Sequence, residues 1–275
     1  INSYTDNTIS NVTRHYYYVV TNNNLGDSSP SDTLYGYPSK IWYVEMNGSD
    51  SNDGKSKTKA FQTIEQAVKT NNSLVTGDTI YVGPSISSSK SKDVSGGYYD
   101  FGGLSGGINL GHTKDFVLKG TSGADSTIFN AEGKNRHFYF QNGQTAATKI
   151  IGITFYRGKG TSPGGGSIAM YGSSTKLQFE NCVFDSNRVV RATDDYGYDG
   201  GAIAIRQGAT PSFTGCTFSN NWVEDYQDSR GGGAVRIDWP SSSDDVKSTI
   251  YFKQCKFIGN YVQSNRSAYG GAVFA

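Results

Sequence analysis

The sequence predicts an all-β fold, a right-handed parallel β-helix, from its composition and from an internal repeat. The chain has 275 residues, of which 35 are Gly and 19 are Tyr, while hydrophobic residues make up 35%. Abundant Gly and Tyr in a chain with few apolar residues are typical of short strands joined by many turns. The 3 Cys residues are too few, and odd in number, for a scaffold held together by disulfides.

An internal repeat decides the architecture. Residues 179–189, 213–223 and 252–262 align position for position, and each copy contains Cys-x-Phe-x-x-Asn. After a loop of variable length, each copy resumes with a Gly pair and an apolar strand. A weaker copy at residues 150–170 lacks the Cys and the Asn. The insertions therefore fall in loops, while the strand positions stay fixed.

The repeat favours the stacked turns of a solenoid over other folds. Cys and Phe two residues apart lie on one face of a strand, and we expect three short strands per repeat. A helical repeat needs an apolar period of about 3.6 residues and a β-sandwich needs hairpin turns, and the repeat shows neither pattern. In a parallel β-helix each turn lies about 4.8 Å above the last, so equivalent residues form ladders.

The ladder residues are expected to be structural. Three residue types recur at fixed positions, as Phe155, Phe184, Phe218 and Phe257, as Asn187, Asn221 and Asn260, and as Cys182, Cys216 and Cys255. We expect Phe to stack in the interior and Asn to stand at bends, where it tolerates left-handed backbone and hydrogen-bonds the next Asn. The Cys side chains would fill one interior column as reduced thiols rather than bind zinc.

A short helix is expected to close the first turn of the solenoid. Thr63 and Gln66 form a capping-box pattern, and Ile64, Ala67 and Val68 give the helix an apolar face. Such a cap covers strand edges that would otherwise be unpaired.

In this interpretation, residues 1–39 form a separate segment and residues 40–275 form the β-helix. A Tyr-rich stretch at residues 16–21 and a second stretch at 33–38 flank a Gly-containing turn, which predicts a hairpin. A lone hairpin is unstable without a partner sheet. Because the chain starts without a leader and stops inside a repeat, we expect the parent protein to continue beyond residue 275.

Three parts of the chain resemble known families. The Gly-Gly-Ala and Cys-x-Phe-x-x-Asn units of residues 150–275 resemble the repeats of polymorphic outer membrane proteins. Residues 42–83 resemble the start of pectate-lyase-like β-helix proteins, with the turn Gly-Ser-Asp-Ser-Asn-Asp-Gly and the strand Gly-Asp-Thr-Ile-Tyr-Val. Residues 4–38 are similar to the C-terminal half of a fibronectin type III domain. The resemblance implies a secreted, multidomain bacterial or archaeal protein, extracellular or on the cell surface.

The low net charge and the lack of a long apolar segment restrict the classes of partner that the chain can have. A formal net charge of +1 excludes a strongly basic nucleic-acid binder, and no segment is long and apolar enough to span a membrane. We expect the partners to be cell-surface glycans or neighbouring copies of the same protein.

The candidate site consists of the loops between each Asn bend and the next Gly pair, because stacked repeats also stack these loops on one flank. The candidate ligand-binding residues are Asp194, Asp195, Tyr196, Asp199, Trp222, Asp225, Tyr226 and Asp228. Among them, the candidate Ca²⁺ ligands are Asp194, Asp195, Asp199, Asp225 and Asp228. The alternative is that these charges only keep exposed loops soluble.

Two functions fit this interpretation. The first is a non-catalytic extracellular β-helix module of an adhesin or filament, with glycan or Ca²⁺ binding by the loops. The second is a polysaccharide lyase or related carbohydrate-active enzyme, which the pectate-lyase-like resemblance implies. Such a lyase neutralises a uronate with Ca²⁺ and uses a basic side chain as base, for which Arg191 and Arg230 are the candidates.

Overall fold

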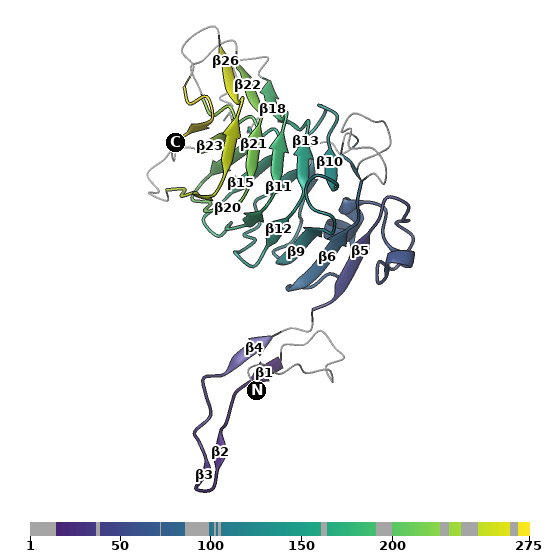
Figure 1. The fold of residues 1–275 in the computed structure, drawn as a ribbon, viewed down its shortest axis with the longest axis vertical. Coiled ribbons are helices and arrows are strands. Elements are labelled where there is room, and N and C mark those ends of the chain that lie inside the picture. Colours follow the sequence, from purple (N-terminus) through teal and green to yellow (C-terminus); the bar gives the residue numbers. More distant parts are fainter. Residues whose placement is uncertain are drawn as a thin grey trace.

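The computed structural model is nearly all-β (Figure 1). It describes residues 15–36, 39–71, 73–85, 99–101, 103, 106–160, 164–190, 200–225, 231–237, 247–264 and 269–275. Two short helical segments, η1 (Lys57–Lys59) and η2 (Gln66–Thr70), lie near the start of the main body. Within the described ranges, no helix is long and apolar enough to cross a membrane.

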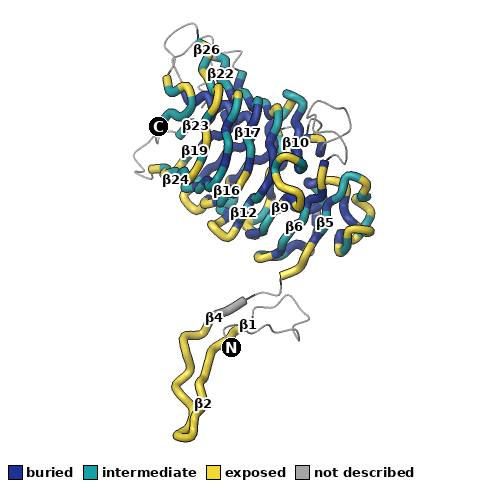
Figure 2. The backbone as a smooth tube through the Cα atoms, viewed as in Figure 1, coloured by how far each residue is buried: buried dark blue, intermediate teal, exposed yellow. Residues whose placement is uncertain are grey.

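The N-terminal segment is an antiparallel hairpin. Strand β1 (His15–Tyr17) pairs with β4 (Leu34–Gly36), and β2 (Asn22–Asn23) pairs with β3 (Gly26–Asp27) at the tip. Figure 2 shows the hairpin as an exposed arm that leads away from the buried body of the molecule. The predicted hairpin is confirmed, and the described residues show no further strand of a fibronectin-like sandwich.

The main body consists of four parallel sheets. Sheet 1 contains β5 (Ile41–Val44), β6 (Asp78–Val82), β9 (Phe116–Gly120), β12 (Lys149–Ile151), β16 (Gln178–Glu180), β20 (Ser212–Thr214) and β24 (Tyr251–Lys253). Sheet 2 contains β7 (Tyr99–Asp100), β10 (Ile128–Asn130), β13 (Thr154–Tyr156), β17 (Val183–Asp185), β21 (Thr217–Ser219) and β25 (Lys256–Ile258). Sheet 3 contains β14 (Lys159–Gly160), β18 (Arg188–Val190), β22 (Trp222–Asp225) and β26 (Tyr261–Ser264). Sheet 4 contains β8 (Ile108–Asn109), β11 (Phe138–Phe140), β15 (Ile168–Tyr171), β19 (Ile203–Arg206), β23 (Val235–Ile237) and β27 (Val273–Phe274).

The chain passes through these sheets in a fixed order. From β16 it continues through β17, β18 and β19, and it returns to sheet 1 at β20, directly beside β16 (Figure 1). We call one such passage a circuit. Successive circuits pair in parallel and in register, so that Phe179 lies opposite Phe213 and Phe184 opposite Phe218. This arrangement is compatible with the expected β-helix.

The expectation of three strands per repeat is wrong, because a full circuit has four. The additional strand follows the Asn bend and forms sheet 3. There Val189 is buried and pairs with Val223 of the next circuit, which in turn pairs with Val262. An extended segment with one inward-facing Val is enough to add a ladder of hydrogen bonds, even though it is only three or four residues long.

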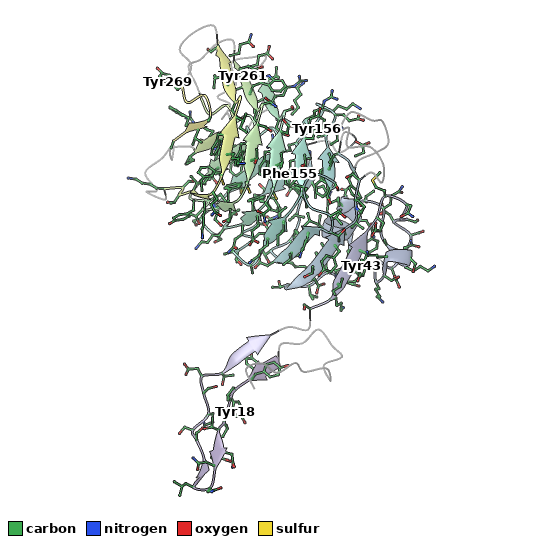
Figure 3. The ribbon with its side chains drawn as sticks, in the orientation of Figure 1. Tyr18, Tyr43, Phe155, Tyr156, Tyr261 and Tyr269 are labelled. Carbon is green, nitrogen blue, oxygen red and sulfur yellow. The ribbon has the colours of Figure 1, made fainter. Side chains whose placement is uncertain are left out.

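Two columns of Phe rings fill the interior, as the repeat predicts. In the column of sheet 2, the ring centroid of Phe184 lies 5.0 Å from that of Phe155 and 4.9 Å from that of Phe218. In sheet 1, the rings of Phe179 and Phe213 stack at 4.8 Å. These five side chains are buried, and Figure 3 labels Phe155 among the strands of the body. Such ring pairs contribute about 0.5–1.5 kcal/mol each beyond the burial of their area.

A ladder of buried Asn side chains holds the bend between sheets 2 and 3. The Nδ2 amide of Asn187 donates to the carbonyl of Phe155 at 3.0 Å and to Oδ1 of Asn221 at 2.9 Å. Asn221 repeats the pattern with the carbonyl of Phe184 and Oδ1 of Asn260, both at 2.9 Å. The predicted hydrogen bonds from Asn to Asn are confirmed.

The left-handed backbone, in contrast, lies one residue before each ladder Asn. The φ angle is +56° at Ser186, +52° at Asn220 and +61° at Gly259. The expectation that the ladder Asn itself takes this conformation is therefore wrong. The chain reverses first, and the next residue then points its amide into the interior.

Each Gly pair brings the chain into direct backbone contact with sheet 3. The first Gly of a pair has a left-handed φ, which is +102° at Gly200 and +85° at Gly232. The second approaches a strand closely, since a Cβ on Gly201 would lie 2.1 Å from the carbonyl oxygen of Gly233 and 2.6 Å from the nitrogen of Trp222. The conformation of the first residue favours Gly, and the contact at the second excludes any side chain.

The predicted cap is present around η2. Its apolar face, which includes Ile64 and Ala67, is buried against the first circuits. The backbone N–H of Gln66 donates to Oγ1 of Thr63 at 3.1 Å, and the N–H of Thr63 donates to the Asp50 carboxylate at 2.9 Å. Asp50 therefore fixes the turn that starts the helical segment.

The Cys column contains three thiols that form no disulfide. Cys182 and Cys216 are buried, and Cys255 is half-buried in the last circuit. The Sγ of Cys182 lies 3.4 Å from the carbonyl oxygen of Ile150, and that of Cys216 lies 3.6 Å from the carbonyl oxygen of Phe179. A side-chain hydrogen bond with Cys182, together with burial, raises the pKa of Cys216, and burial raises the pKa of Cys255.

His137 is a buried neutral residue of the interior. Its Nε2 donates to the carbonyl of Phe129 at 2.8 Å, and its Nδ1 lies 3.1 Å from the hydroxyl of Ser167, which donates to it. The rings of Phe101 and Phe155 lie at 5.1 and 5.3 Å. Burial lowers the pKa of His137 to about 3, despite backbone hydrogen bonds that favour the charged form.

We expect Asn221→Ala to lower the free energy of unfolding by about 3 kcal/mol or more. The change removes the side-chain hydrogen bonds from Asn221 to the Phe184 carbonyl and to Asn260, and it takes the Oδ1 acceptor away from the backbone N–H and the side-chain amide of Asn187. Each buried group that loses a partner costs about 1–3 kcal/mol. Urea unfolding followed by circular dichroism measures the loss. The matched control is Asn220→Gly, which keeps the left-handed bend and should change stability by less than about 1 kcal/mol. An equal loss of unfolding free energy in the two variants would contradict the view that the Asn ladder stabilises the bend.

Stability should fall as the pH drops below about 6.5, in part because of His137. The unfolded chain binds a proton on this residue near its ordinary pKa, whereas the folded chain does so only near pH 3, so stability is complete above pH 6.5 and declines down to about pH 3. The slope from this group approaches about 1.4 kcal/mol per pH unit. Urea titrations between pH 7 and 5.5 should show a smaller slope in His137→Gln than in the unchanged protein. An identical slope would show that His137 does not contribute.

The thiols should react slowly in the folded protein. Burial and raised pKa values suppress the reactive thiolate of Cys216, and the half-buried Cys255 should be the first to react. Labelling with a thiol-reactive dye should give three modified cysteines after denaturation without reductant. Recovery of a single thiol would show a disulfide and refute the column of free side chains.

Candidate functional site

Most residues of the predicted site lie outside the described part of the chain. These are Arg191, Asp194, Asp195, Tyr196, Asp199, Tyr226, Asp228 and Arg230. Asp225 ends strand β22, where its backbone pairs with Ser264. Trp222 is the one predicted site residue whose side chain is described. The convergence of the predicted site residues on one flank therefore stays a prediction.

Trp222 belongs to a cation–aromatic column on sheet 3. The guanidinium carbon of Arg188, in the preceding circuit, lies 5.5 Å from the ring centroid of Trp222. The ring of Tyr261, in the following circuit, lies 6.2 Å away and within 5° of parallel. Figure 3 places Tyr261 near the C-terminal end of the stacked sheets. The described part of the predicted flank is therefore a column of large side chains in mutual contact.

A second region, which sequence reasoning missed, forms a polar groove of about 600 Å³. Its lining residues are Lys69, Asn71, Asn109, Gly111, His112, Lys114, Gln141 and Asn142. We call this set the groove. Four of the eight are amides, which offer both a donor and an acceptor to a ligand.

The groove forms where the end of η2 meets the turns that follow sheet 4. Lys69 and Asn71 come from the end of the helical segment, and Asn109 ends β8. Gln141 and Asn142 follow β11, the next strand of the same sheet, which pairs with β8 in register. Residues far apart in the sequence therefore meet because consecutive circuits stack.

His112 ties the helical segment to the first of these turns. Its Nε2 donates to the carbonyl of Val68 at 2.7 Å, and its Nδ1 accepts the backbone N–H of Lys114 at 3.2 Å. These two bonds require the neutral ring with the proton on Nε2. They hold Lys114 near the end of η2, where Lys69 follows Val68.

Side-chain amides connect one turn to the next. Asn142 donates from Nδ2 to the carbonyl of Leu110, and Gln144 donates from Nε2 to the carbonyl of His112. The turn after β11 is thereby fixed on the turn after β8. The groove wall is built on these bonds and on the parallel strands beneath them.

Two polar atoms at this corner have no hydrogen-bond partner. They are Nδ2 of Asn71, which lines the groove, and Oε1 of Gln144 directly behind His112, and both are buried. Buried polar groups are nearly always paired, so an unpaired donor in a groove wall indicates a partner such as a ligand or a water molecule. Asn71 therefore lines the groove with a buried amide that still lacks an acceptor.

A row of aromatic and basic side chains continues from the groove along sheet 4. Tyr139 lies opposite Asn109 in the register, and its ring lies 5.3 Å from that of Tyr171 in the next circuit. Arg206 donates from Nη1 to the Tyr171 hydroxyl at 3.0 Å, with its guanidinium 5.1 Å from that ring. Burial raises the pKa of Tyr171, although Arg206 opposes the shift. The outer face of sheet 4 therefore presents polar groups over several circuits.

A smaller pocket of about 210 Å³ lies beside the start of η2. It is lined by Met46, Gln62, Thr63, Ile64, Glu65, Tyr99, Asp100 and Phe101. Met46, Ile64 and Phe101 contribute apolar wall, so this pocket offers fewer hydrogen-bonding groups than the groove does.

Metal binding at the predicted carboxylates is not tested by the described residues. Among these residues, no group of three or more His, Cys, Asp or Glu side chains is arranged to hold a metal ion. Asp194, Asp195, Asp199 and Asp228 lie outside the described ranges, as does the side chain of Asp225. The Ca²⁺ site stays a prediction.

Comparison with known proteins gave one similar structure. No protein-family model and no curated protein matches the chain. A solved structure titled "Rhamnogalacturonan lyase" superposes with a TM-score of 0.44 at 17% sequence identity, over 84% of this chain and 53% of that chain. The chain thus spans about half of the length of that solved protein.

Proposed function

We propose that the chain is a non-catalytic module of an extracellular surface protein and that it binds glycans through the groove. The observation that carries this proposal is the set of four amide side chains lining one groove of about 600 Å³. Sugar hydroxyls donate and accept hydrogen bonds, as amides do, so the two groups match. The volume lies within the ~300–1,000 Å³ typical of small-ligand sites.

The rigidity of the corner supports a binding role. Asn142 is fixed on the carbonyl of Leu110, and His112 is fixed on that of Val68. A site whose side chains are held before binding loses little conformational entropy when the ligand arrives. Asn109 and Gln141 lie beside these fixed residues, and their side chains are exposed rather than packed in the interior.

The finer architecture belongs to the same proposal. We infer that the four sheets form a right-handed parallel β-helix over residues 40–275 and that residues 1–39 form a fibronectin-like arm. Parallel in-register pairing through all four sheets supports the β-helix. A long β-helix gives a surface protein length without a large core, which suits an adhesin or a filament.

The proposal predicts binding without cleavage. Affinity electrophoresis through gels that contain plant, algal or bacterial polysaccharides should retard the protein in at least one gel. The double variant Asn109→Ala/Gln141→Ala should weaken that binding about tenfold, because each lost hydrogen bond contributes about 0.5–1.5 kcal/mol. The matched control is Gln178→Ala, an amide on sheet 1 outside the groove, which should bind as the unchanged protein does.

Incubation with uronate polymers and Ca²⁺ distinguishes the module from the alternative lyase. A module leaves the polymer intact, whereas a lyase produces unsaturated ends that absorb ultraviolet light. Production of such ends would overturn the non-catalytic function, and failure to bind any glycan would overturn the groove as its site.

A further inference from the structure

We infer that the groove selects an anionic polysaccharide, whose carboxylate or sulfate groups are held by Lys69 and Lys114. This inference rests on the proposed glycan binding and adds the charge of the ligand. It follows from the charges in the groove, from the way the backbones of the two lysines are held and from an unpaired donor in the groove wall.

Among the described residues that line the groove there are cationic side chains and no carboxylate. Lys69 and Lys114 carry the charge, and the remaining lining side chains are amides, a Gly and the neutral His112. Lys114 forms no ion pair within the described part of the chain. Two lysines that line one groove attract anions and repel cations, and no acid among the described lining residues offsets them.

Lys69 has one partner outside the groove. Its Nζ lies 2.8 Å from Oε1 of Glu65, one turn earlier in the helical segment, and both side chains are partly exposed. Exposed pairs of this kind are weak, because water and salt screen them. An anionic group of a ligand can therefore share or replace Glu65 as the partner of Lys69.

His112 places the two lysines on the same site. It joins the carbonyl of Val68, the residue before Lys69, to the backbone N–H of Lys114. The distance between the two lysine backbones is thus set by one imidazole ring and two hydrogen bonds. This bridge fixes, relative to each other, the two stretches of backbone from which the lysine side chains extend.

Asn71 supplies the second, independent observation. It is buried to more than nine-tenths, and its Nδ2 donor has no partner, although its Oδ1 accepts the N–H of Ser73 at 3.1 Å. An unpaired donor lacks an acceptor, and oxygen atoms of carboxylates and sulfates accept hydrogen bonds without donating any. The groove wall therefore combines two cations with a buried amide N–H that lacks an acceptor, a combination that favours an oxyanion.

The test uses polysaccharides that differ only in charge. Polygalacturonate is compared with its methyl ester, and dextran sulfate is compared with dextran, by affinity electrophoresis at low and at physiological salt. The charged member of at least one pair should bind at least tenfold more tightly than its neutral partner, and salt should weaken it. The pair that binds identifies the anion as carboxylate or sulfate.

Variants locate the effect. Lys69→Gln and Lys114→Gln should each weaken binding of the charged polymer about fivefold or more, and should reduce the preference for the charged over the neutral polymer by the same factor. The matched control is Lys119→Gln, an exposed lysine of β9 outside the groove, which should have no effect beyond the change in net charge. Circular dichroism and thermal melting of each variant show that it is folded.

The outcomes separate the inference from the proposed function. Equal binding of charged and neutral polymers, lost only in the amide variant, would overturn the inference and keep glycan binding. Equal losses in Lys119→Gln and Lys114→Gln would also overturn it, since the effect would then be one of overall charge. Absence of binding to all four polymers and to every other glycan tested would overturn both.

Discussion

The buried Asn ladder between sheets 2 and 3 is the constraint on which the regular part of the fold depends. The amides of Asn187 and Asn221 each donate to a carbonyl of the circuit before and to an Asn of the circuit after, so these circuits depend on their neighbours. Parallel strands have uniform hydrogen bonds along their length, which by themselves tolerate a shift of register. The ladder removes that freedom, and the Phe columns stack because the register is fixed.

The ladder also shows at which circuit the regular repeat begins. In the weaker repeat the position of the Asn is taken by Gly158, whose N–H donates to Oδ1 of Asn187 at 2.8 Å. The same backbone bond recurs in the later circuits, where the N–H of Asn187 donates to Oδ1 of Asn221 and the N–H of Asn221 donates to Oδ1 of Asn260, both at 3.0 Å. What Gly158 lacks is the side-chain amide that adds further bonds there. The described residues of the earlier circuits form no such ladder, and these circuits carry the cap, the groove and the buried His137.

The sequence predicted the regular half of the molecule because stacking requires the same residue type at each rung. Phe, Asn and Gly therefore revealed the strands, the bend and the return to sheet 4. Sheet 3 was missed because three or four residues with a single inward Val make a weak pattern. The left-handed bend was placed one residue late, since Asn220 and Ser186 carry no signal that distinguishes them from the ladder Asn beside them.

The groove could not be predicted in the same way. Lys69, Asn109 and Gln141 belong to a helical end and to two early circuits, where the repeat is too weak to align one turn with the next. The available signal was an amide and a Gly after each apolar strand, in Asn109 to Gly111 and in Asn142-Gly143. Of the candidate ligand-binding residues on the predicted flank, Trp222 is the one whose side chain is described.

The Gly pairs have a consequence for how such a chain changes over evolutionary time. Gly166, Gly201 and Gly233 lie against the backbones of Arg188, Trp222 and Tyr261, which anchors the return of each loop at a fixed place. Between two anchored ends, added residues cost little, because the entropy of closing a loop grows only with the logarithm of its length. Each circuit can therefore accept loops of different length and sequence. Binding residues on the surface can be gained or lost in this way without a change in the packing of the interior.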